Sequence, residues 1–402
     1  MSEAVIIIGG GQAGGQAALS LRQLGFEGAV TVVGDEPYVP YERPPLSKSF
    51  LAGEVSEERM FMRPAAFYAE KSLVLLQKTT VTRIDRAARS VHLAEGEPLP
   101  YSKLVLATGG RVRKMNCPGA GLPGVHYLRT IDDVLAFRDR LTAGAKLVIV
   151  GGGYIGLEVA AVAIKRGCKV TVLEMQPLVL NRVVAPEMSR FYTDVHRAAG
   201  VDIRTSAAVT AFEGAGRVER VICGDSIVAA DIVIVGIGIV PNVELAADAG
   251  LAVNNGIVVD DCARTADPDI FAAGDCTNHP NEVIGGCLRL ESVPNALAQG
   301  KAAAHAIMGN PQPVTEVPWF WSDQYDLKLQ MTGLSKPGDR IVIRGSMAAH
   351  KFSACYLREG VFVACQAVNM AKDFLQSKKL IAARTRPDPM RLADPSLALK
   401  DL

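Results

Sequence analysis

The chain has 402 residues, of which 43 are Lys or Arg and 42 are Asp or Glu, so its formal net charge is only +1. A chain of this length is expected to form two or three domains, and its balanced charge argues against a partner held by bulk charge, such as nucleic acid or an anionic membrane. An acid, Glu3, stands where a signal peptide carries bases. We therefore expect a cytoplasmic protein with no membrane segment.

The first predicted element is an apolar strand, residues 5–8, that leads into a glycine-rich turn. Gly9, Gly11 and Gly14 have the spacing of a loop that holds the pyrophosphate of a dinucleotide at the start of a helix. The next apolar strand is followed by Asp35, whose carboxylate suits the hydroxyls of a ribose. Because strand, turn, helix, strand and acid follow one another, this segment is predicted to bind a nucleotide.

The same order of elements is repeated near the middle of the chain. Gly151, Gly153 and Gly156 repeat the spacing of the first loop, and Glu174 ends the strand that follows. A carboxylate at this place accepts ribose hydroxyls and repels a 2'-phosphate, which favours NADH over NADPH. Arg182, further along the chain, is a cation that would weaken this preference.

The alternation of short apolar strands with helical stretches favours an α/β fold with parallel sheets. We predict two Rossmann-like dinucleotide-binding domains, in a duplication like that of glutathione reductase, followed by a C-terminal α+β domain. The predicted boundaries are 1–111 and 239–317 for a discontinuous first domain, 112–238 for the second, and 318–402 for the third. The longest apolar stretch, 227–240, is interrupted by Asp231 and is predicted to form a buried strand.

Six motifs extend this pattern, one of which includes the second glycine loop. They are YxRPPLSK at 41–48, YLRT at 127–130, GGGYIGLE at 151–158, GD at 274–275, ESVPNA at 291–296 and PWFWSDQ at 318–324. With these motifs the chain resembles, through nearly its whole length, the FAD-dependent, NADH-using ferredoxin reductases that supply bacterial oxygenases. The resemblance implies that the first repeat binds FAD without a covalent bond and that the second repeat binds NADH.

The resemblance also implies which residues hold the two dinucleotides. Those expected at FAD are Gly9, Gly11, Ala13, Gly14, Asp35, Arg43, Lys48, Val81, Ala107, Arg129, Asp275, Val293 and Trp321. Those expected at NADH are Gly153, Ile155, Gly156 and Glu174. Arginine suits phosphate charge, and Asp275 either meets a ribityl hydroxyl or caps a following helix. For Trp321, the residue pattern alone leaves open a contact with the flavin, a contact with the nicotinamide, or packing in the core.

Lys48 and Glu158 are the expected catalytic residues. The resemblance places Lys48 near the reactive edge of the flavin and Glu158 on the helix after the NADH loop. A fixed ammonium stabilises electron density that arrives by hydride transfer, and a carboxylate can hold that ammonium and orient the nicotinamide. The alternative is that both are exposed surface charges, which is the more common state of Lys and Glu.

The cysteine pattern bears on where the electrons go. The eight cysteines include no Cys-x-x-Cys pair, which flavoprotein disulfide reductases use to accept electrons, so we expect an external acceptor. The expected reaction passes electrons from NADH through FAD to a 2Fe-2S ferredoxin that supplies a monooxygenase or a ring-hydroxylating dioxygenase. Cys276 and His279 have a metal-like spacing but no second pair beside them, so no metal site is expected.

Two other functions are compatible with parts of the sequence. An NADH oxidase-like flavoprotein would need a redox cysteine near the first flavin-binding helix, and residues 43–50 contain none. A flavoprotein that senses NADH, like apoptosis-inducing factor, shares the segment 43–48. We expect a monomer or a weak homodimer. Basic residues that either dock an acidic ferredoxin or form a solvated helix face are Lys372, Lys378, Lys379, Arg384 and Arg386.

Overall fold

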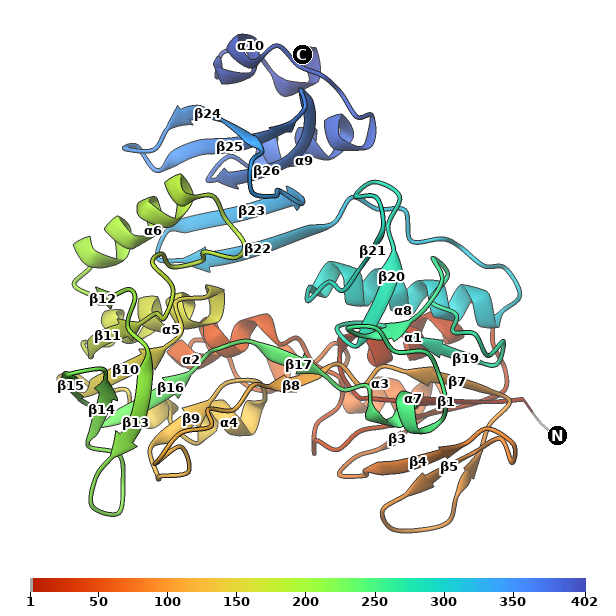
Figure 1. Ribbon diagram of the computed structural model, residues 1–402. Helices are drawn as coiled ribbons and strands as arrows, with labels where there is room; N and C mark the ends of the chain where they lie inside the picture. Colours follow the sequence, from red (N-terminus) through yellow and green to blue (C-terminus); the bar gives the residue numbers. More distant parts are fainter. Residues whose placement is uncertain (1–2) are drawn as a thin grey trace. The chain divides into compact units, whose positions relative to one another are not determined.

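The structure is a computed structural model that describes residues 3–402, and its chain divides into two compact units (Figure 1). Unit 1 comprises Met1–Arg43, Glu58–Arg111 and Val240–Phe320, and unit 2 comprises Pro44–Glu57, Val112–Ile239 and Trp321–Leu402. The segment 44–57, which we expected in the first domain, groups with unit 2. The predicted boundaries of the three domains stay a prediction.

Unit 1 is built on a five-stranded parallel sheet in the order β19-β7-β1-β2-β3. Its strands are β1 (Ala4–Ile8), β2 (Ala29–Val33), β3 (Leu73–Leu76), β7 (Lys103–Leu106) and β19 (Ile270–Ala272). The continuous apolar runs of β1 and β19 are buried, as is typical of a parallel sheet covered on both faces. The parallel α/β sheet predicted for the first repeat is confirmed.

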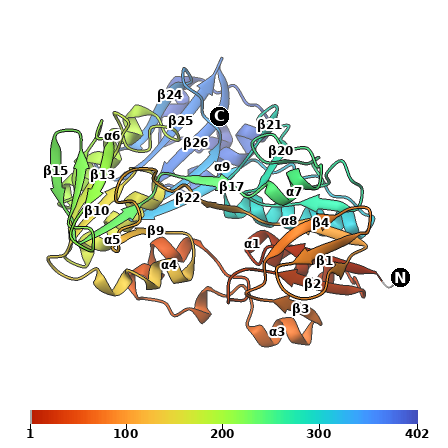
Figure 2. The ribbon, with the colours of Figure 1, turned by 60° about the horizontal axis from the view of Figure 1, so that its bottom comes forward.

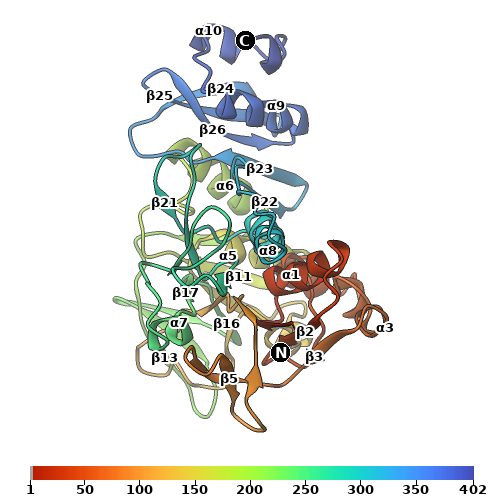
Figure 3. The ribbon, with the colours of Figure 1, turned by 90° about the vertical axis from the view of Figure 1, so that its right-hand side faces the viewer.

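Two helices of unit 1, α1 (Gln12–Gln23) and α8 (Val293–Ile307), lie side by side (Figure 3). Small residues permit this approach: a Cβ atom on Gly300 of α8 would lie 2.6 Å from the carbonyl oxygen of Ala13 in α1. Smaller elements complete the unit. They are α3 (Ala65–Glu70), β4 (Val81–Asp85), β5 (Ser90–Leu93), β6 (Leu99–Pro100), α7 (Glu244–Asp248), β18 (Ile257–Val258), β20 (Thr277–Pro280) and β21 (Cys287–Leu288).

Unit 2 contains a second five-stranded parallel sheet, in the order β12-β11-β10-β16-β9. Its strands are β9 (Val125–Tyr127), β10 (Lys146–Val150), β11 (Lys169–Leu173), β12 (Asp202–Arg204) and β16 (Ile232–Val235). The main helices are α5 (Tyr154–Lys165) and α6 (Pro186–Ala198). In both sheets the strand before the glycine loop pairs with the strand after the helix, so the predicted duplication is confirmed.

The prediction of a single buried strand over 227–240 is wrong. The segment forms three strands, β15 (Ser226–Ala229), β16 and β17 (Ile239–Pro241). Only β16 is fully buried, whereas Ile227 is 66% exposed on an antiparallel sheet with β13 (Val209–Glu213) and β14 (Arg220–Cys223). Glycines end β16, and β17 pairs with β8 (Gly110–Val112), where the chain passes between the two units.

The C-terminal part of the chain forms an antiparallel sheet in the order β22-β23-β26-β25-β24, with α9 (Ala371–Ala382) packed against β23 and β26 (Figure 2). Its strands are β22 (Trp319–Gln324), β23 (Leu327–Gly333), β24 (Arg340–Ser346), β25 (Lys351–Arg358) and β26 (Val361–Val368), and α10 (Pro389–Ala393) follows. Arg344 and Asp373 form a buried ion pair, 2.9 Å apart, that ties α9 to β24. The predicted α+β module is confirmed.

A capping box begins the short helix α4 (Ile131–Leu135) in unit 2. The Thr130 hydroxyl accepts a hydrogen bond from the Asp133 backbone N–H, and the Asp133 carboxylate accepts one from the Thr130 N–H. Thr130→Ala is expected to lower the free energy of unfolding by about 1 kcal/mol, because a helix N-terminus loses its side-chain acceptor. Chemical denaturation measures the loss, with Thr210→Ala, an exposed strand position, as the control. Equal stability of the two variants would contradict the role of the cap.

Within residues 3–402, no helix is both long enough and apolar enough to cross a membrane.

Candidate active site

The first glycine loop combines two packed glycines with one open position. Gly9 has φ +117°, and a Cβ on it would lie 2.1 Å from the Ala107 carbonyl oxygen. A Cβ on Gly14 would lie 2.0 Å from the Gly9 carbonyl oxygen. On Gly11, by contrast, a Cβ would meet no atom of the described chain within 4 Å. The loop is therefore held against strand and helix, while Gly11 leaves space at the start of α1 for a group to approach the backbone.

The second loop has the same arrangement. Gly151 has φ +106° and would place a Cβ 2.4 Å from the Gly236 carbonyl oxygen, and Gly156 would place one 2.3 Å from the Gly151 carbonyl oxygen. A Cβ on Gly153 would find no neighbour within 4 Å among residues 3–402. Ile155, in the first turn of α5, is 43% exposed. Both loops thus have the cradle that a dinucleotide pyrophosphate requires.

Asp35 and Glu174, the acids expected at the ribose of each repeat, differ by one residue in their distance from the preceding strand. Glu174 follows β11 directly and accepts hydrogen bonds from the backbone N–H groups of Gly152 at 2.6 Å and Gln176 at 2.8 Å. In the first repeat Gly34 takes the corresponding place, and a Cβ there would lie 3.3 Å from the Gly10 nitrogen. Asp35 comes one residue later and is exposed. The Glu174 carboxylate is therefore fixed on its loop, whereas Asp35 faces outward.

Arg43 is held by a partner that the sequence did not indicate. Its guanidinium donates to Glu36 at 2.6 Å and to the Tyr41 hydroxyl at 3.0 Å. Burial acts to lower the pKa of Arg43, but Tyr41, Glu36 and Asp275 together raise it from its ordinary value. Asp275 is thus close enough to interact with Arg43, and the structure brings these two expected FAD residues together within unit 1.

The residues around Asp275 contain a buried donor without a partner. Asp275 comes after β19, and the element that follows is strand β20, so the alternative of a helix cap is wrong. The Gln299 side-chain oxygen accepts from the Gly274 N–H at 2.8 Å. Its Nε2 is buried and has no hydrogen-bond partner within the described part of the chain. Gly274 also contacts Ala13: a Cβ on Gly274 would lie 3.0 Å from the Ala13 Cβ.

The remaining expected FAD residues have the following positions. Ala107 contacts Gly9 in the first loop, Val81 is buried at the start of β4, and Val293 is the first residue of α8. Arg129 and Trp321 belong to unit 2. The Arg129 backbone N–H donates to Asp133 at 2.8 Å, and Trp321 is half-buried in β22.

Lys48 and Glu158 form the expected ion pair. The predicted boundaries place them in different domains, but both lie in unit 2. The Lys48 ammonium donates to Glu158 Oε2 at 2.7 Å. Glu158 is only 2% exposed, on the buried side of α5. Two hydroxyls also donate to its carboxylate, Ser47 to Oε2 and Ser322 to Oε1, the latter at 2.6 Å. Glu158 is not a surface charge, and the donors compensate for its burial.

Two buried tyrosines interact with the charge of Glu158. Tyr192 on α6 is fully buried, and burial, Asp323 and Glu158 all raise its pKa well above the ordinary value. Tyr154 likewise has a pKa raised well above the ordinary value by burial and by Tyr192, Tyr356 and Glu158. Both phenols are therefore neutral at physiological pH, and Glu158 is the negative charge that both experience in this part of unit 2.

The structure reveals a pair of cysteines that sequence spacing could not show. Cys355 in β25 lies directly opposite Cys365 in β26, and both are completely buried. Their mutual hydrogen bond and burial raise the pKa of Cys355 well above the ordinary value, so it is an unreactive thiol. Cys276 and His279 do not join in a metal-like group: within residues 3–402 the group of that kind is Asp260, Asp261 and Cys262.

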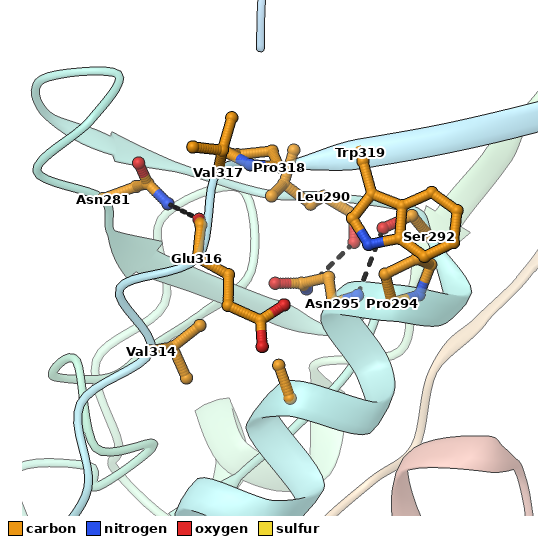
Figure 4. A pocket seen from close by; sticks show the side chains of 11 residues that line it. Asn281, Leu290, Ser292, Pro294, Asn295, Val314, Glu316, Val317, Pro318 and Trp319 are labelled. Atoms are coloured by element: carbon orange, nitrogen blue, oxygen red, sulfur yellow. Dashed lines mark hydrogen bonds between the residues drawn. The ribbon is translucent and has the colours of Figure 1, made fainter. Parts of the chain in front are cut away.

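A small cavity in unit 1 lies between the start of α8 and the segment before β22 (Figure 4). Its volume is about 20 Å³, and its lining includes Asn281, Asn295, Glu316 and Trp319. That volume suits roughly one water molecule. This cavity is too small for a dinucleotide and is not the cofactor site.

Two of the basic residues considered for docking have local roles. Lys378 lies over the Phe374 ring on α9, and Arg386 donates to the Glu359 carbonyl oxygen. The segment 277–287 forms the β20–β21 hairpin. A docking surface stays a prediction.

The chain was compared with known proteins. Residues 3–300 match the family model for pyridine nucleotide-disulphide oxidoreductases, and residues 319–402 match the model for the reductase C-terminal domain. The chain is 44% identical to putidaredoxin reductase CamA of Pseudomonas putida over 99% of this chain and 96% of that protein. It is 42% identical to the ferredoxin–NAD(+) reductase component of the anthranilate 1,2-dioxygenase system of Burkholderia cepacia, over 98% of each chain.

A solved structure agrees with these sequence similarities. The reductase in the covalent putidaredoxin reductase–putidaredoxin complex superimposes with a TM-score of 0.96, at 44% identity, over 99% of this chain and 97% of that one. The predicted fold, with two dinucleotide-binding domains and a C-terminal reductase domain, is confirmed by this match. The chain belongs to the family of pyridine nucleotide-disulphide oxidoreductases.

Proposed function

We propose that this chain is an NADH-dependent, FAD-containing ferredoxin reductase that passes electrons to a 2Fe-2S ferredoxin supplying an oxygenase. The observation that carries the proposal is the doubled loop, in which Gly11 and Gly153 leave open space at the starts of two helices. Two such cradles on one chain suit two dinucleotides. The similarity to ferredoxin reductases of oxygenase systems over the full length supports the same function.

The residues of the first repeat fit FAD. Gly11 admits a pyrophosphate at the N-terminus of α1, where backbone N–H groups and the helix dipole favour negative charge. The unpaired Gln299 Nε2 supplies a buried donor next to Gly274. Asp35 is exposed and available to ribose hydroxyls. We assign the other expected FAD residues to this cofactor as part of the proposal.

The residues of the second repeat fit NADH. Gly153 leaves the space for the pyrophosphate, and Gly156 permits close packing of helix and strand. The fixed Glu174 carboxylate suits ribose hydroxyls and opposes a 2'-phosphate, so NADH is preferred to NADPH. Ile155, in the first turn of α5, presents an exposed apolar side chain beside the loop.

The chain's own residues prepare the transfer of electrons. FAD, when bound, supplies the ability to accept an electron pair from NADH and to release electrons one at a time. Lys48 provides a positive charge, and Glu158 fixes the position of that charge through the 2.7 Å ion pair. The burial of Glu158 excludes water and strengthens this interaction. We propose Lys48 and Glu158 as the catalytic residues.

The oligomeric state, the location in the cell and the docking surface are also part of the proposal. We propose a monomer or weak homodimer in the cytoplasm, with no nucleic-acid or membrane partner. The docking surface for the ferredoxin is proposed to use the basic residues of the C-terminal module. The reductase relatives favour this function over an NADH oxidase or an NADH sensor.

The proposal is tested by NADH-driven cytochrome c reduction with and without added putidaredoxin, used as a 2Fe-2S surrogate. We expect NADH alone to bleach the flavin absorbance, and we expect putidaredoxin to increase the rate of cytochrome c reduction at least tenfold. Flavin bleaching without stimulation, together with a change in oligomeric state on addition of NADH, would instead identify a sensor.

A further inference from the structure

A row of buried polar side chains leads from Glu158 to helix α6. Ser322 and Gln324 alternate along β22, so both point to the same face of the strand. Gln324 Nε2 lies 3.1 Å from Ser322 Oγ, and Gln324 Oε1 lies 2.8 Å from His196 Nε2. The other ring nitrogen of His196 lies 2.9 Å from the Tyr325 hydroxyl. Ser322, Gln324 and His196 are each at most 1% exposed, and all of these residues belong to unit 2.

The hydrogen bonds in this row all run in one direction. The Ser322 hydroxyl donates to Glu158, so its oxygen is free to accept from the Gln324 amide nitrogen. The Gln324 oxygen then accepts from His196 Nε2, which fixes the neutral tautomer with the proton on Nε2. His196 Nδ1 accepts from Tyr325. Burial lowers the pKa of His196, although its hydrogen bond with Gln324 opposes this effect, so the ring is neutral at pH 7.

The chemistry of Gln324 decides what such a row can do. A carboxamide nitrogen donates a hydrogen bond but does not readily release its proton, so the row is unsuited to carrying protons to Glu158. The row of hydrogen bonds instead fixes the orientation of the Glu158 carboxylate. Ser322 donates a hydrogen bond to Oε1 of Glu158, while Ser47 and Lys48 donate to Oε2. Rotation of the carboxylate would therefore break hydrogen bonds on both oxygens. Breaking them in a buried site is costly because water cannot replace the lost donors.

We propose that Ser322, held by Gln324 and His196, is a positioning residue that sets the orientation of Glu158 and hence of the Lys48 ammonium. The inference rests on the proposed function of that ion pair. It gives the C-terminal module a direct role in the reaction, because β22 supplies the hydroxyl that reaches the carboxylate. From the sequence this module was expected to contact a partner and to bring Trp321 to a cofactor.

The test compares Ser322→Ala with Ser377→Ala in stopped-flow reduction of the bound flavin by NADH. Ser377 is an equally buried serine of the same module, but its hydroxyl donates to the Phe374 carbonyl oxygen within α9. Ser322→Ala is expected to lower the limiting rate about tenfold while the dissociation constant of NADH changes less than twofold. Ser377→Ala is expected to change neither quantity by more than twofold. Equal rates in the two variants would overturn the inference.

Two substitutions of His196 extend the test along the row. His196→Gln retains a nitrogen donor toward Gln324, so its limiting rate is expected to stay within about threefold of the unmodified protein. His196→Leu removes the donor at similar volume and is expected to resemble Ser322→Ala. If His196→Leu reduces as fast as His196→Gln, the part of the inference that concerns His196 is wrong.

A spectroscopic measurement separates this inference from the proposed function. ¹⁵N NMR of the histidine side chains in the flavin-loaded protein is expected to show His196 as the neutral Nε2–H tautomer, and Gln324→Leu is expected to remove that preference. A mixed or charged His196 would overturn the row of hydrogen bonds whether or not NADH reduces the flavin. Failure of NADH to reduce the flavin of the unmodified protein, with the tautomer as expected, would overturn the proposed function instead.

Discussion

Replacing Glu158 with glutamine is expected to slow the reduction of the bound flavin by NADH about 100-fold, equal to about 2.7 kcal/mol of lost transition-state stabilisation. The carboxylate accepts from Lys48 on one oxygen and from Ser322 on the other. An amide group replaces one of these acceptors with a donor, so either Lys48 or Ser322 loses its bond. The ammonium loses its counter-charge in either case, and it also loses its fixed position when the amide nitrogen faces it. Stopped-flow absorbance measures the rate.

Two comparisons make the Glu158→Gln result specific. Glu213→Gln removes a carboxylate of the same unit that is 45% exposed and paired with Arg220, and its rate is expected to stay within twofold of the unmodified protein. Lys48→Met alone is expected to be slow, and the double variant Lys48→Met with Glu158→Gln is expected to be little slower than either single variant, because the pair acts as a unit. Fully additive losses would show that the two residues act separately.

Replacing Gly153 with alanine is expected to weaken NADH binding at least tenfold while the free energy of unfolding without NADH changes by less than about 1 kcal/mol. Gly153 has φ −80° and ψ −179°, which alanine adopts without strain, and a Cβ there meets no described atom within 4 Å. The methyl group therefore costs the folded chain little. It projects into the space that we assign to the pyrophosphate. Titration of flavin-loaded protein with NAD⁺ measures the affinity.

Gly156→Ala, in the same loop, is expected to affect stability, whereas Gly153→Ala is expected to affect NADH binding. Its Cβ would lie 2.3 Å from the Gly151 carbonyl oxygen, so backbone must move and the free energy of unfolding is expected to fall by about 1–3 kcal/mol. Gly11→Ala, the counterpart of Gly153→Ala in the first repeat, is expected to lower the FAD content of the purified protein and to spare the NADH loop. If Gly153→Ala binds NAD⁺ normally, the second loop does not hold the pyrophosphate.

Local patterns predicted the repeated framework well. The strands before and after each glycine loop, the loops themselves and the acid Glu174 are set by neighbours within about 30 positions, and each choice agrees with the next. The stretch 227–240 was misjudged because three short strands with different burial look alike as an apolar run. Composition indicates apolar character, but it does not show which strand lies at an exposed sheet.

The donors around Glu158 could not be predicted because they come from distant parts of the chain. Ser47 and Ser322 are ordinary hydroxyl residues, and nothing in their neighbourhood indicates that both reach one carboxylate. The pairing of Cys355 with Cys365 depends on the register of an antiparallel sheet, which is not visible as a Cys-x-x-Cys motif. The one usable signal, on which no sequence-based prediction rested, is the alternation of Ser322 and Gln324 along a strand, since it predicts a shared face.

The contacts of Glu158 also have a consequence for how the protein folds. Ser47 precedes Glu158 by 111 positions and Ser322 follows it by 164 positions. Contacts of such long range require the closure of large loops, so we expect them to form after the local strands and helices. The buried carboxylate acquires its full set of donors only when the segment 44–57, helix α5 and strand β22 have all assembled. A partly folded or truncated chain would then have glycine loops without a fixed Lys48. Such a chain would oxidise NADH poorly until folding is complete.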